Sequence, residues 1–261
     1  MEDVYAWRPE MAKVLVTGGN GFLGSWLVRR LMKDGHQVKC LVRKTSDLRE
    51  LESLGSKDGL SPEYVYGDVT DLPSVIKACE NVEAVFHLAG LIAYKKSERA
   101  AMDRINVGGT KNVIEACLTN KVPRLVYLSS VVAVGAGFNK GDILNEESVY
   151  NVKHLNLGYF ETKHEAEKLV VEACKTRGLN AVILNPSTIY GPGDARKGSR
   201  KNQLKVAQGK LKFYTSGGVN VVPVENCVDG IIKAWQKGRN GERYILAGQN
   251  LTIKELFRII A

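Results

Sequence analysis

The sequence predicts an α/β fold in which helices cover both faces of a doubly wound parallel sheet. Apolar, strand-like runs alternate with segments whose apolar residues recur at helical spacing, as at Phe22, Leu23, Trp26, Leu27 and Leu31. Such alternation is typical of a parallel sheet with crossover helices. With 261 residues, 44% of them hydrophobic, the chain is long enough to bury a large core.

The elements can be placed in order along the chain. Strands are expected at 13–17, 37–42, 63–67, 84–88, 124–129 and 181–185. Helices are expected between them at 22–34, 72–79, 99–119 and 156–177. After residue 187 the pattern becomes irregular and richer in Gly and Lys, which suits a smaller lobe sharing the end of the sheet. We expect this lobe to be truncated, because a capping box at Thr252–Glu255 opens an amphipathic helix in which the chain ends.

A glycine-rich turn follows the first expected strand, at Thr17–Gly24. Glycines at such a turn let the backbone approach a pyrophosphate, and the N-terminus of the following helix attracts its charge. Gly19, Gly21 and Gly24 fit one dinucleotide-binding spacing, whereas Gly18, Gly21 and Gly24 fit a looser one. Any tight strand-to-helix turn also uses glycines, so the turn alone predicts a dinucleotide site only weakly.

A tyrosine and a lysine lie four residues apart in the helix expected at 156–177. Tyr159 and Lys163 therefore share one helix face, one turn apart. The strand expected at 124–129 ends in Ser129 and Ser130, at the carboxyl end of a parallel strand where open sheets bind ligands. A Tyr-x-x-x-Lys pair by itself is more often a surface feature. Combined with the glycine turn and the strand-end serines in this order, it predicts a catalytic site.

These motifs make the chain resemble an extended short-chain dehydrogenase/reductase, in the dihydroflavonol-reductase-like branch of the NAD-dependent epimerase/dehydratase family. The resemblance runs from residue 13 to 261 and includes the motifs at His87–Gly90, Asn106–Thr110 and Asn185–Gly193. It implies a dinucleotide-binding Rossmann domain over residues 11–186 and a substrate lobe over residues 187–261.

The resemblance also implies the roles of the catalytic groups. Tyr159 would give a proton to a carbonyl oxygen, and Lys163, together with the positive nicotinamide, would lower its pKa. Only one of Ser129 and Ser130 can bind the substrate oxygen, because neighbouring side chains point to opposite faces of a strand, and the resemblance assigns this role to Ser130. Many relatives carry a further Ser or Thr where this chain has Val131, which leaves the register of the serine open.

Two polar residues have both a functional and a structural interpretation. Asn106 matches the family's helix asparagine, which is linked to a water relay, but it could equally satisfy a helix turn. Asp68 lies where the family contacts the adenine amino group. It could instead support the turn into the helix that begins near Leu72, with Thr70 or Asp71 as the cap of that helix. The full expected cofactor set is Thr17, Gly18, Gly21, Phe22, Leu23, Gly24, Arg43, Lys44, Asp68, Val69, Leu88, Ala89, Gly90, Tyr159, Lys163, Pro186, Ser187, Thr188 and Ile189.

The end of the second expected strand bears on the choice of cofactor. NAD-specific folds place an acid there to bind the ribose hydroxyl, whereas this strand ends in Arg43 and Lys44. Arginine offers a planar fork of donors to a phosphate, so NADP(H) is favoured. The alternative is an exposed basic pair, in which case NAD(H) would be used without the help of an acid.

Composition argues against several other classes of function. The net charge is +9, but the basic residues are spread along the chain without a block, so we expect no nucleic-acid partner. No apolar run approaches the roughly 20 residues that span a bilayer, so we expect no membrane partner. Five scattered cysteines are typical of reduced core residues in a cytoplasmic protein. The histidines lack ligand spacing, so no metal is expected.

The sequence therefore predicts an NADP(H)-dependent oxidoreductase that reduces a ketone or aldehyde of a small, rather apolar substrate. Apolar residues at Tyr94, 131–134 and Phe138 are expected to line its site. One alternative is a nucleotide-sugar epimerase or dehydratase with bound NAD, its diphosphate clamp formed by Arg196, Lys197, Arg200 and Lys201. A second is a non-catalytic NADP-binding module. Because relatives pair the helices at 99–119 and 156–177, a homodimer is also expected.

Overall fold

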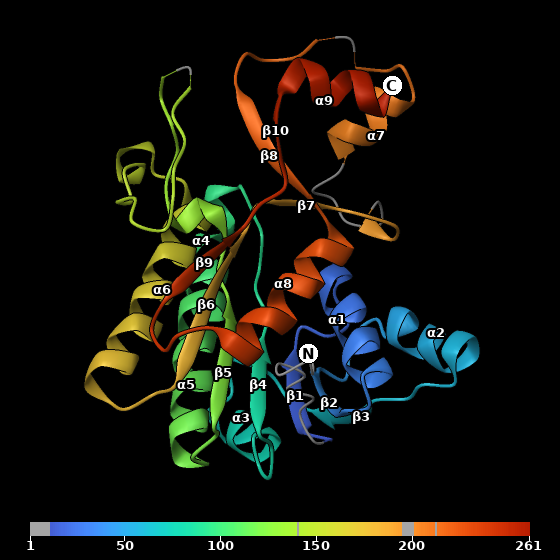
Figure 1. Cartoon of the computed structure of the whole chain (residues 1–261), viewed down its shortest axis with the longest axis vertical. Coiled ribbons are helices and arrows are strands. Elements are labelled where there is room, and N and C mark those ends of the chain that lie inside the picture. Colours follow the sequence, from blue (N-terminus) through green and yellow to red (C-terminus); the bar gives the residue numbers. More distant parts are fainter. Residues whose placement is uncertain (1–10, 140, 195–200, 212) are drawn as a thin grey trace, which may run out of the picture.

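The computed structural model describes residues 11–139, 141–194, 201–211 and 213–261. A large α/β body carries a smaller lobe at one end of its sheet (Figure 1). The strands are β1 (Lys13–Thr17), β2 (Gln37–Val42), β3 (Glu63–Tyr66), β4 (Ala84–His87), β5 (Arg124–Leu128), β6 (Ala181–Pro186), β7 (Thr188–Tyr190), β8 (Gly218–Pro223), β9 (Arg243–Leu246) and β10 (Gln249–Thr252). The α-helices are α1 (Phe22–Lys33), α2 (Arg49–Asp58), α3 (Leu72–Ala78), α4 (Arg99–Met102), α5 (Gly109–Thr119), α6 (Gly158–Thr176), α7 (Lys201–Ala207), α8 (Val224–Lys237) and α9 (Ile253–Ile260). In the described ranges, no helix has the length and apolar character needed to cross a membrane.

The body is built on a seven-stranded sheet in the order β3-β2-β1-β4-β5-β6-β9. Every neighbouring pair is parallel. The chain winds from β1 outward to β3, and then returns to place β4 on the other side of β1. Thr17 pairs with Leu41 on one side and His87 on the other, so these strands end at one edge. The winding reverses between β1 and β4, which is where open α/β sheets form a ligand crevice.

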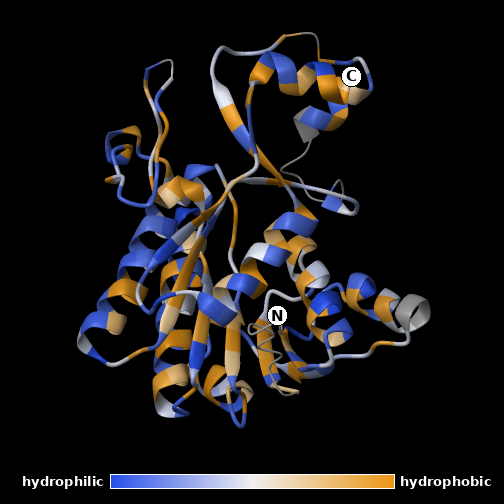
Figure 2. Ribbon diagram, viewed as in Figure 1, coloured by the Kyte–Doolittle hydropathy of each residue, from blue (hydrophilic) through white to orange (hydrophobic). Residues whose placement is uncertain are grey.

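Apolar side chains fill the space on both faces of this sheet. One core joins the sheet to α1, α2 and α8 and includes Leu27 and Trp235. The other joins it to α3, α5 and α6 and includes Val113 and Val170. Hydrophobic residues accordingly gather along the central strands and on the helix sides facing them (Figure 2). Strands β4 and β6 are buried along their whole length, as expected for parallel strands covered on both faces.

The lobe consists of a three-stranded sheet in the order β10-β8-β7, together with α7 and α9. The chain after β6 contributes to both the body and the lobe. Helix α8 packs in the first core of the body, and β9 pairs with β6 in its sheet. Helix α9 begins with the expected capping box, in which the Glu255 amide donates to the Thr252 hydroxyl over 3.1 Å. The ring of Tyr214, between α7 and β8, packs edge-on against the ring of Phe257 in α9.

The predicted α/β class with a doubly wound parallel sheet is confirmed, and all six expected strands are present. The single helix expected at 99–119 is wrong in detail. It is divided into α4, a π-helical segment at Asp103–Gly108 and α5, with Asn106 in the π-helical turn. Helix α2 is not expected from the sequence, because it is rich in charged residues and contributes mainly Leu51 and Leu54 to the core.

The turn between β1 and α1 depends on two glycines whose surroundings are backbone. Gly18 has a φ of +73°, and a Cβ on it would lie 2.8 Å from the Ala89 nitrogen. A Cβ on Gly24 would lie 2.1 Å from the carbonyl oxygen of Gly18. A Cβ on Gly19, by contrast, would meet the Cys40 side chain at 3.0 Å. The structure therefore supports the spacing that begins at Gly18 rather than the one that begins at Gly19.

We predict that Gly24→Ala destabilises the protein by about 1–3 kcal/mol, because backbone atoms must move to admit the new methyl group. Urea denaturation measures the change in the free energy of unfolding. Gly55→Ala in α2 is the matched control, because its Cβ would lie 3.6 Å from the nearest atom. The control is expected to be neutral or stabilising, since alanine favours helix. Equal stability of Gly24→Ala and the native chain would contradict the tight turn.

Candidate functional site

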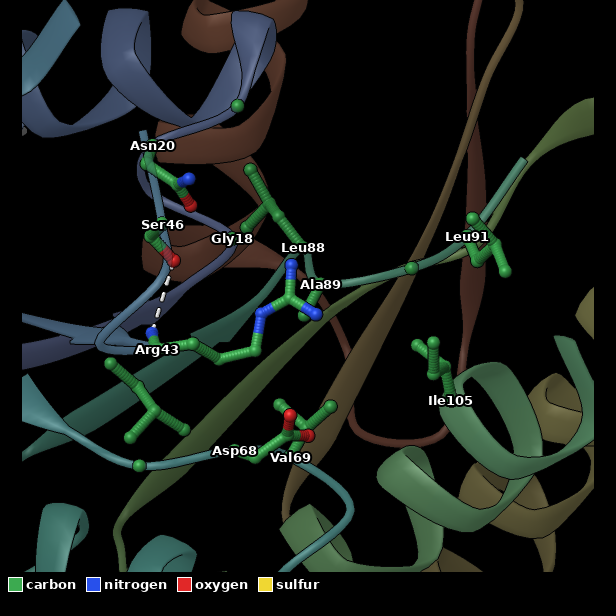
Figure 3. Close-up of a pocket in the computed structure, with 14 residues that line it drawn as sticks. Gly18, Asn20, Arg43, Ser46, Asp68, Val69, Leu88, Ala89, Leu91 and Ile105 are labelled. Carbon is green, nitrogen blue, oxygen red and sulfur yellow. Dashed lines mark hydrogen bonds between the residues drawn. The ribbon is translucent and has the colours of Figure 1, made fainter. Parts of the chain in front are cut away.

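A cavity of about 290 Å³ opens where β1 and β4 end (Figure 3). Its volume is near the lower end of the range for small-molecule sites, about 300–1,000 Å³. The residues lining it are Gly18, Asn20, Gly21, Leu41, Arg43, Ser46, Gly67, Asp68, Val69, Leu88, Ala89, Gly90, Leu91 and Ile105. Six of these lie outside the expected cofactor set, namely Asn20, Leu41, Ser46, Gly67, Leu91 and Ile105. Some adjoin expected residues, as Asn20 and Leu91 do, whereas Ile105 comes from a helix that only the folded chain brings to the cavity.

The expected residues of the glycine turn divide between the cavity and the interior. Gly18 and Gly21 line the cavity, and Gly21 caps the N-terminus of α1. Thr17, Leu23 and Gly24 are buried behind this surface. Phe22 lies on the other side of the turn, where its ring approaches Gly191 and Gly193. The cavity surface at this turn is therefore backbone, with the positive end of α1 directed toward it.

A buried hydrogen-bond chain fixes the loop after β4 against β1. The Ala89 amide donates to Thr17 Oγ1 over 3.2 Å, and Thr17 Oγ1 lies 2.7 Å from His87 Nδ1. His87 Nε2 lies 3.1 Å from Thr110 Oγ1, which donates to the Asn106 carbonyl over 2.6 Å. These partners assign the proton of His87 to Nε2. Burial lowers the pKa of His87 to about 3, so the ring is neutral at physiological pH.

The two basic residues after β2 are placed differently. Arg43 lines the cavity, and its side chain extends across the opening toward Ala89 (Figure 3). Its backbone amide donates to the Ser46 hydroxyl over 3.0 Å, which fixes the start of the loop. Lys44 is exposed and is not among the lining residues. The Arg43 guanidinium has no ion-pair partner among the residues that the structure describes, and it is suited to an anionic ligand group.

Asp68 combines the two interpretations that the sequence left open. It lines the cavity beside Val69, and its Oδ1 accepts from both the amide and the hydroxyl of Thr70 at 2.9 Å. The cap of α3 is Asp71, whose carboxylate accepts from the Ser74 amide over 3.3 Å. The structural role of Asp68 is therefore present in the turn, and the same carboxylate faces the cavity.

Lys163 lies beside the cavity wall, deep in the protein. Its Nζ donates to the Leu128 carbonyl over 2.7 Å and lies 5.2 Å from the centre of the Tyr127 ring. A Cβ on Gly90 would lie 3.9 Å from that Nζ, so only a glycine of the lining separates the two. Burial lowers the pKa of Lys163 to about 8, while the charge of Glu167 raises it. The ammonium form is therefore favoured at neutral pH.

The Tyr159 side chain lies one helical turn before Lys163 on α6, as expected. The expected lowering of its pKa is wrong for this structure, because burial raises the pKa of Tyr159 to about 12. A hydrogen bond from Ser130 lowers the pKa of Tyr159 in part, whereas the nearby Tyr94 raises it further. Desolvation of the phenolate thus outweighs the hydrogen bond from Ser130. The phenol keeps its proton at neutral pH.

The two strand-end serines face opposite ways. Ser129 is buried and donates to Glu167 Oε2 over 2.5 Å. Ser130 is turned toward Tyr159, and its hydroxyl also accepts from the Val132 amide over 3.4 Å. This arrangement brings together Ser130, Tyr159 and Lys163, and it assigns Ser129 to the packing behind them.

Asn106 is almost fully buried and joins two elements of the site. Its Oδ1 accepts from the Leu91 amide over 2.7 Å, and its Nδ2 donates to the Leu91 carbonyl and to Thr162 Oγ1, each over 3.0 Å. A Cβ on Gly90 would lie 3.3 Å from that Oδ1. The side chain thus ties the loop after β4 to α6, in a π-helical turn of the kind often found at functional sites.

The expected segment at 186–189 crosses from the body to the lobe. Pro186 ends β6, as its missing amide predicts, and Thr188 and Ile189 begin β7. The Ser187 hydroxyl is buried, and it has no hydrogen-bond partner among the residues that the structure describes. Such a group is suited to a bound polar ligand.

The walls expected for the substrate are partly corrected. Ala133 and Val134 are buried in the core and cannot line an open site, whereas Tyr94 and Phe138 are exposed. Val131 and Val132, in the short 3₁₀ turn at Val131–Ala133, are half-buried. The alternative clamp residues Arg196, Lys197 and Arg200 lie outside the described residues, as does the side chain of Lys201.

Comparisons with known proteins agree with this geometry. The profile of the 3-beta hydroxysteroid dehydrogenase/isomerase family matches residues 15–255. The chain is 33% identical to "Sterol demethylase protein B" of Methylococcus capsulatus, covering 94% of this chain and 72% of that protein. It is also 33% identical to a "Putative dihydroflavonol 4-reductase" of Synechocystis, in a match that covers 97% of this chain and 72% of that protein.

Solved structures agree at the level of the fold. The crystal structure of gox2253 covers 95% of this chain, which in turn covers 74% of that one, with a TM-score of 0.87 and 32% identity. A nucleoside-diphosphate-sugar epimerase from Pseudomonas aeruginosa gives a TM-score of 0.81 at 26% identity, in a match that covers 97% of this chain and 77% of that one. The chain therefore belongs to the 3-beta hydroxysteroid dehydrogenase/isomerase family, as an extended short-chain dehydrogenase/reductase of the dihydroflavonol-reductase-like branch.

Proposed function

We propose that this protein is an NADP(H)-dependent reductase of a ketone or aldehyde carbonyl on a small, rather apolar substrate. The observation that carries the proposal is the convergence of Ser130, Tyr159 and Lys163 beside a glycine-lined cavity at the switch point of the sheet. Membership of a family of oxidoreductases supports the class of reaction.

The residues around the cavity fit a nicotinamide dinucleotide. A Cβ on Gly18 would lie 2.8 Å from the Ala89 nitrogen, and a Cβ on Gly90 would lie 3.3 Å from Asn106 Oδ1. Glycines at these positions therefore keep the cavity wall open to a ligand. The N-terminus of α1 suits a pyrophosphate, and the Arg43 guanidinium suits a 2′-phosphate. The buried hydroxyl of Ser187 offers a further polar contact. When bound, NADPH supplies the hydride for the reduction.

The protonation states suit the direction of reduction. Tyr159, with a pKa of about 12, holds its proton and can donate it to a carbonyl oxygen. Lys163 stays charged below about pH 8 and stabilises the phenolate that is left. Ser130 can donate a hydrogen bond to the same substrate oxygen as charge develops on it.

The apolar character of the substrate is supported by two exposed aromatic side chains of the expected substrate walls. Tyr94 is close enough to influence the pKa of Tyr159 and is largely exposed. Phe138 is exposed on the loop before α6, where its ring lies 5.9 Å from His154. Aromatic side chains with few polar groups favour an apolar substrate body around the reacting carbonyl.

We predict that Tyr159→Phe lowers kcat/KM for carbonyl reduction by about 10²–10⁴-fold, because it removes the proton donor. A panel of ketones and aldehydes assayed with NADPH measures the rate, and fluorescence titration checks that NADPH still binds. Tyr64→Phe, on β3 and away from the site, is the matched control. Undiminished turnover by Tyr159→Phe would refute the assigned donor, and turnover without added cofactor would favour the epimerase alternative.

We also predict that Arg43→Ala weakens NADPH binding about tenfold or more and leaves NADH binding unchanged, because a charged hydrogen bond to the 2′-phosphate is lost. Titration of each cofactor gives the two dissociation constants. Lys44→Ala is the companion variant, and its effect is expected to be smaller because Lys44 lies outside the cavity lining. An unchanged preference in Arg43→Ala would mean that the cofactor choice has another origin.

A further inference from the structure

A buried carboxylate lies one helical turn beyond Lys163, on the same face of α6. Glu167 is 2% exposed, and Tyr159, Lys163 and Glu167 follow each other at intervals of four residues. Residues at this spacing are neighbours on a helix surface. The reaction proposed above makes no use of Glu167, although a buried carboxylate is costly unless it is well paired.

Two hydrogen bonds and one ion pair compensate the Glu167 carboxylate. Oε2 accepts from the Ser129 hydroxyl over 2.5 Å and from Asn185 Nδ2 over 2.7 Å. Oε1 lies 3.2 Å from Arg243 Nε in an ion pair. Ser129 and Asn185 both donate to one oxygen, and the cation of Arg243 lies beside the other, so these partners suit a carboxylate.

The same carboxylate ties together the strand ends that carry the site. Ser129 is the residue immediately before Ser130, and Asn185 Nδ2 also donates to the Ser130 carbonyl over 2.9 Å. Arg243 comes from β9, at the edge of the sheet. Glu167 therefore joins α6 to the ends of β5 and β6 and to β9 at the point where Ser130 leaves the sheet.

We propose that Glu167 is a positioning residue that keeps Lys163 in its ammonium form and holds Ser130 in register. This role rests on the reductase function proposed above. Its physical basis is that Lys163 is fully enclosed and donates to a neutral carbonyl, so a fixed negative charge one turn away stabilises its positive charge.

The other titratable groups around Lys163 do not supply that negative charge. His87 on β4 is neutral, because burial holds its pKa at about 3. Tyr127 on β5 and Tyr159 on α6 keep their protons at neutral pH, because burial raises the pKa of each phenol. Arg243 on β9 is positive and acts in the opposite sense. Of these groups, Glu167 alone carries a carboxylate side chain.

The test is to measure the pKa of Lys163 in the full chain by ¹³C-lysine NMR, with its signal assigned from its absence in Lys163→Arg. In Glu167→Gln, which keeps the shape but removes the charge, the pKa of Lys163 is expected to fall by about 1. The alkaline limb of kcat/KM is expected to move to lower pH by the same amount. Glu165→Gln, on the exposed side of α6, is the matched control and is expected to leave both unchanged.

Two further variants separate charge from packing. Ser129→Ala breaks one bond to Glu167 but keeps its charge, so it is expected to lower kcat without moving the pKa of Lys163. Arg243→Met removes the opposing cation and is expected to raise the pKa of Lys163. This variant tests the direction of the electrostatic effect even if Glu167→Gln does not fold.

An unchanged pKa of Lys163 in Glu167→Gln, or in Arg243→Met when Glu167→Gln does not fold, would overturn the proposal and leave Glu167 as a packing residue. The NMR result does not depend on turnover. Absence of carbonyl reduction by the native chain would instead refute the proposed function, so the two failures are distinguishable.

Discussion

An ammonium group held inside the protein is the constraint on which the rest of the site depends. Lys163 is enclosed by β5, α6 and the loop after β4, and its Nζ reaches the Leu128 carbonyl. A charge in this position is unfavourable unless its surroundings are arranged around it. The aromatic face of Tyr127 and the carboxylate of Glu167 provide that arrangement from two different elements.

The sheet topology places this ammonium next to the ligand crevice. Because the winding reverses between β1 and β4, the turn after β1 and the loop after β4 meet without a helix between them. Glycines at 18 and 90 let the two segments and the lysine approach closely. The buried chain through Thr17, His87 and Thr110 then fixes the loop in place. The cavity and the reactive side chains are thus parts of one packed arrangement.

Much of the fold could be predicted because local patterns carry it. The apolar runs of the six strands and the spacing of the tyrosine and lysine are read directly from neighbouring residues. The missed elements depend on distant partners. Strand β9 has little pattern of its own and is defined by its pairing with β6, and α2 contributes only a few apolar side chains.

The same division applies to the site. The strand period predicts that only one of Ser129 and Ser130 faces the site, and the helix period predicts that Tyr159 and Lys163 share one face of α6. The raised pKa of Tyr159 could not be predicted, because it depends on how much protein covers the phenol rather than on the nearby lysine. The role of Glu167 was also missed, since its partners Asn185 and Arg243 come from strands far away in the sequence.

The central claim is that the face of α6 bearing Tyr159 and Lys163 meets the reactive end of a dinucleotide bound in the glycine-lined cavity. A crystal structure of the protein with NADP⁺ tests it most directly. The account predicts the nicotinamide ribose within hydrogen-bonding distance of Lys163 Nζ and Tyr159 Oη, with the 2′-phosphate beside Arg43. A nicotinamide ring bound away from α6, or a dinucleotide bound outside this cavity, would contradict it.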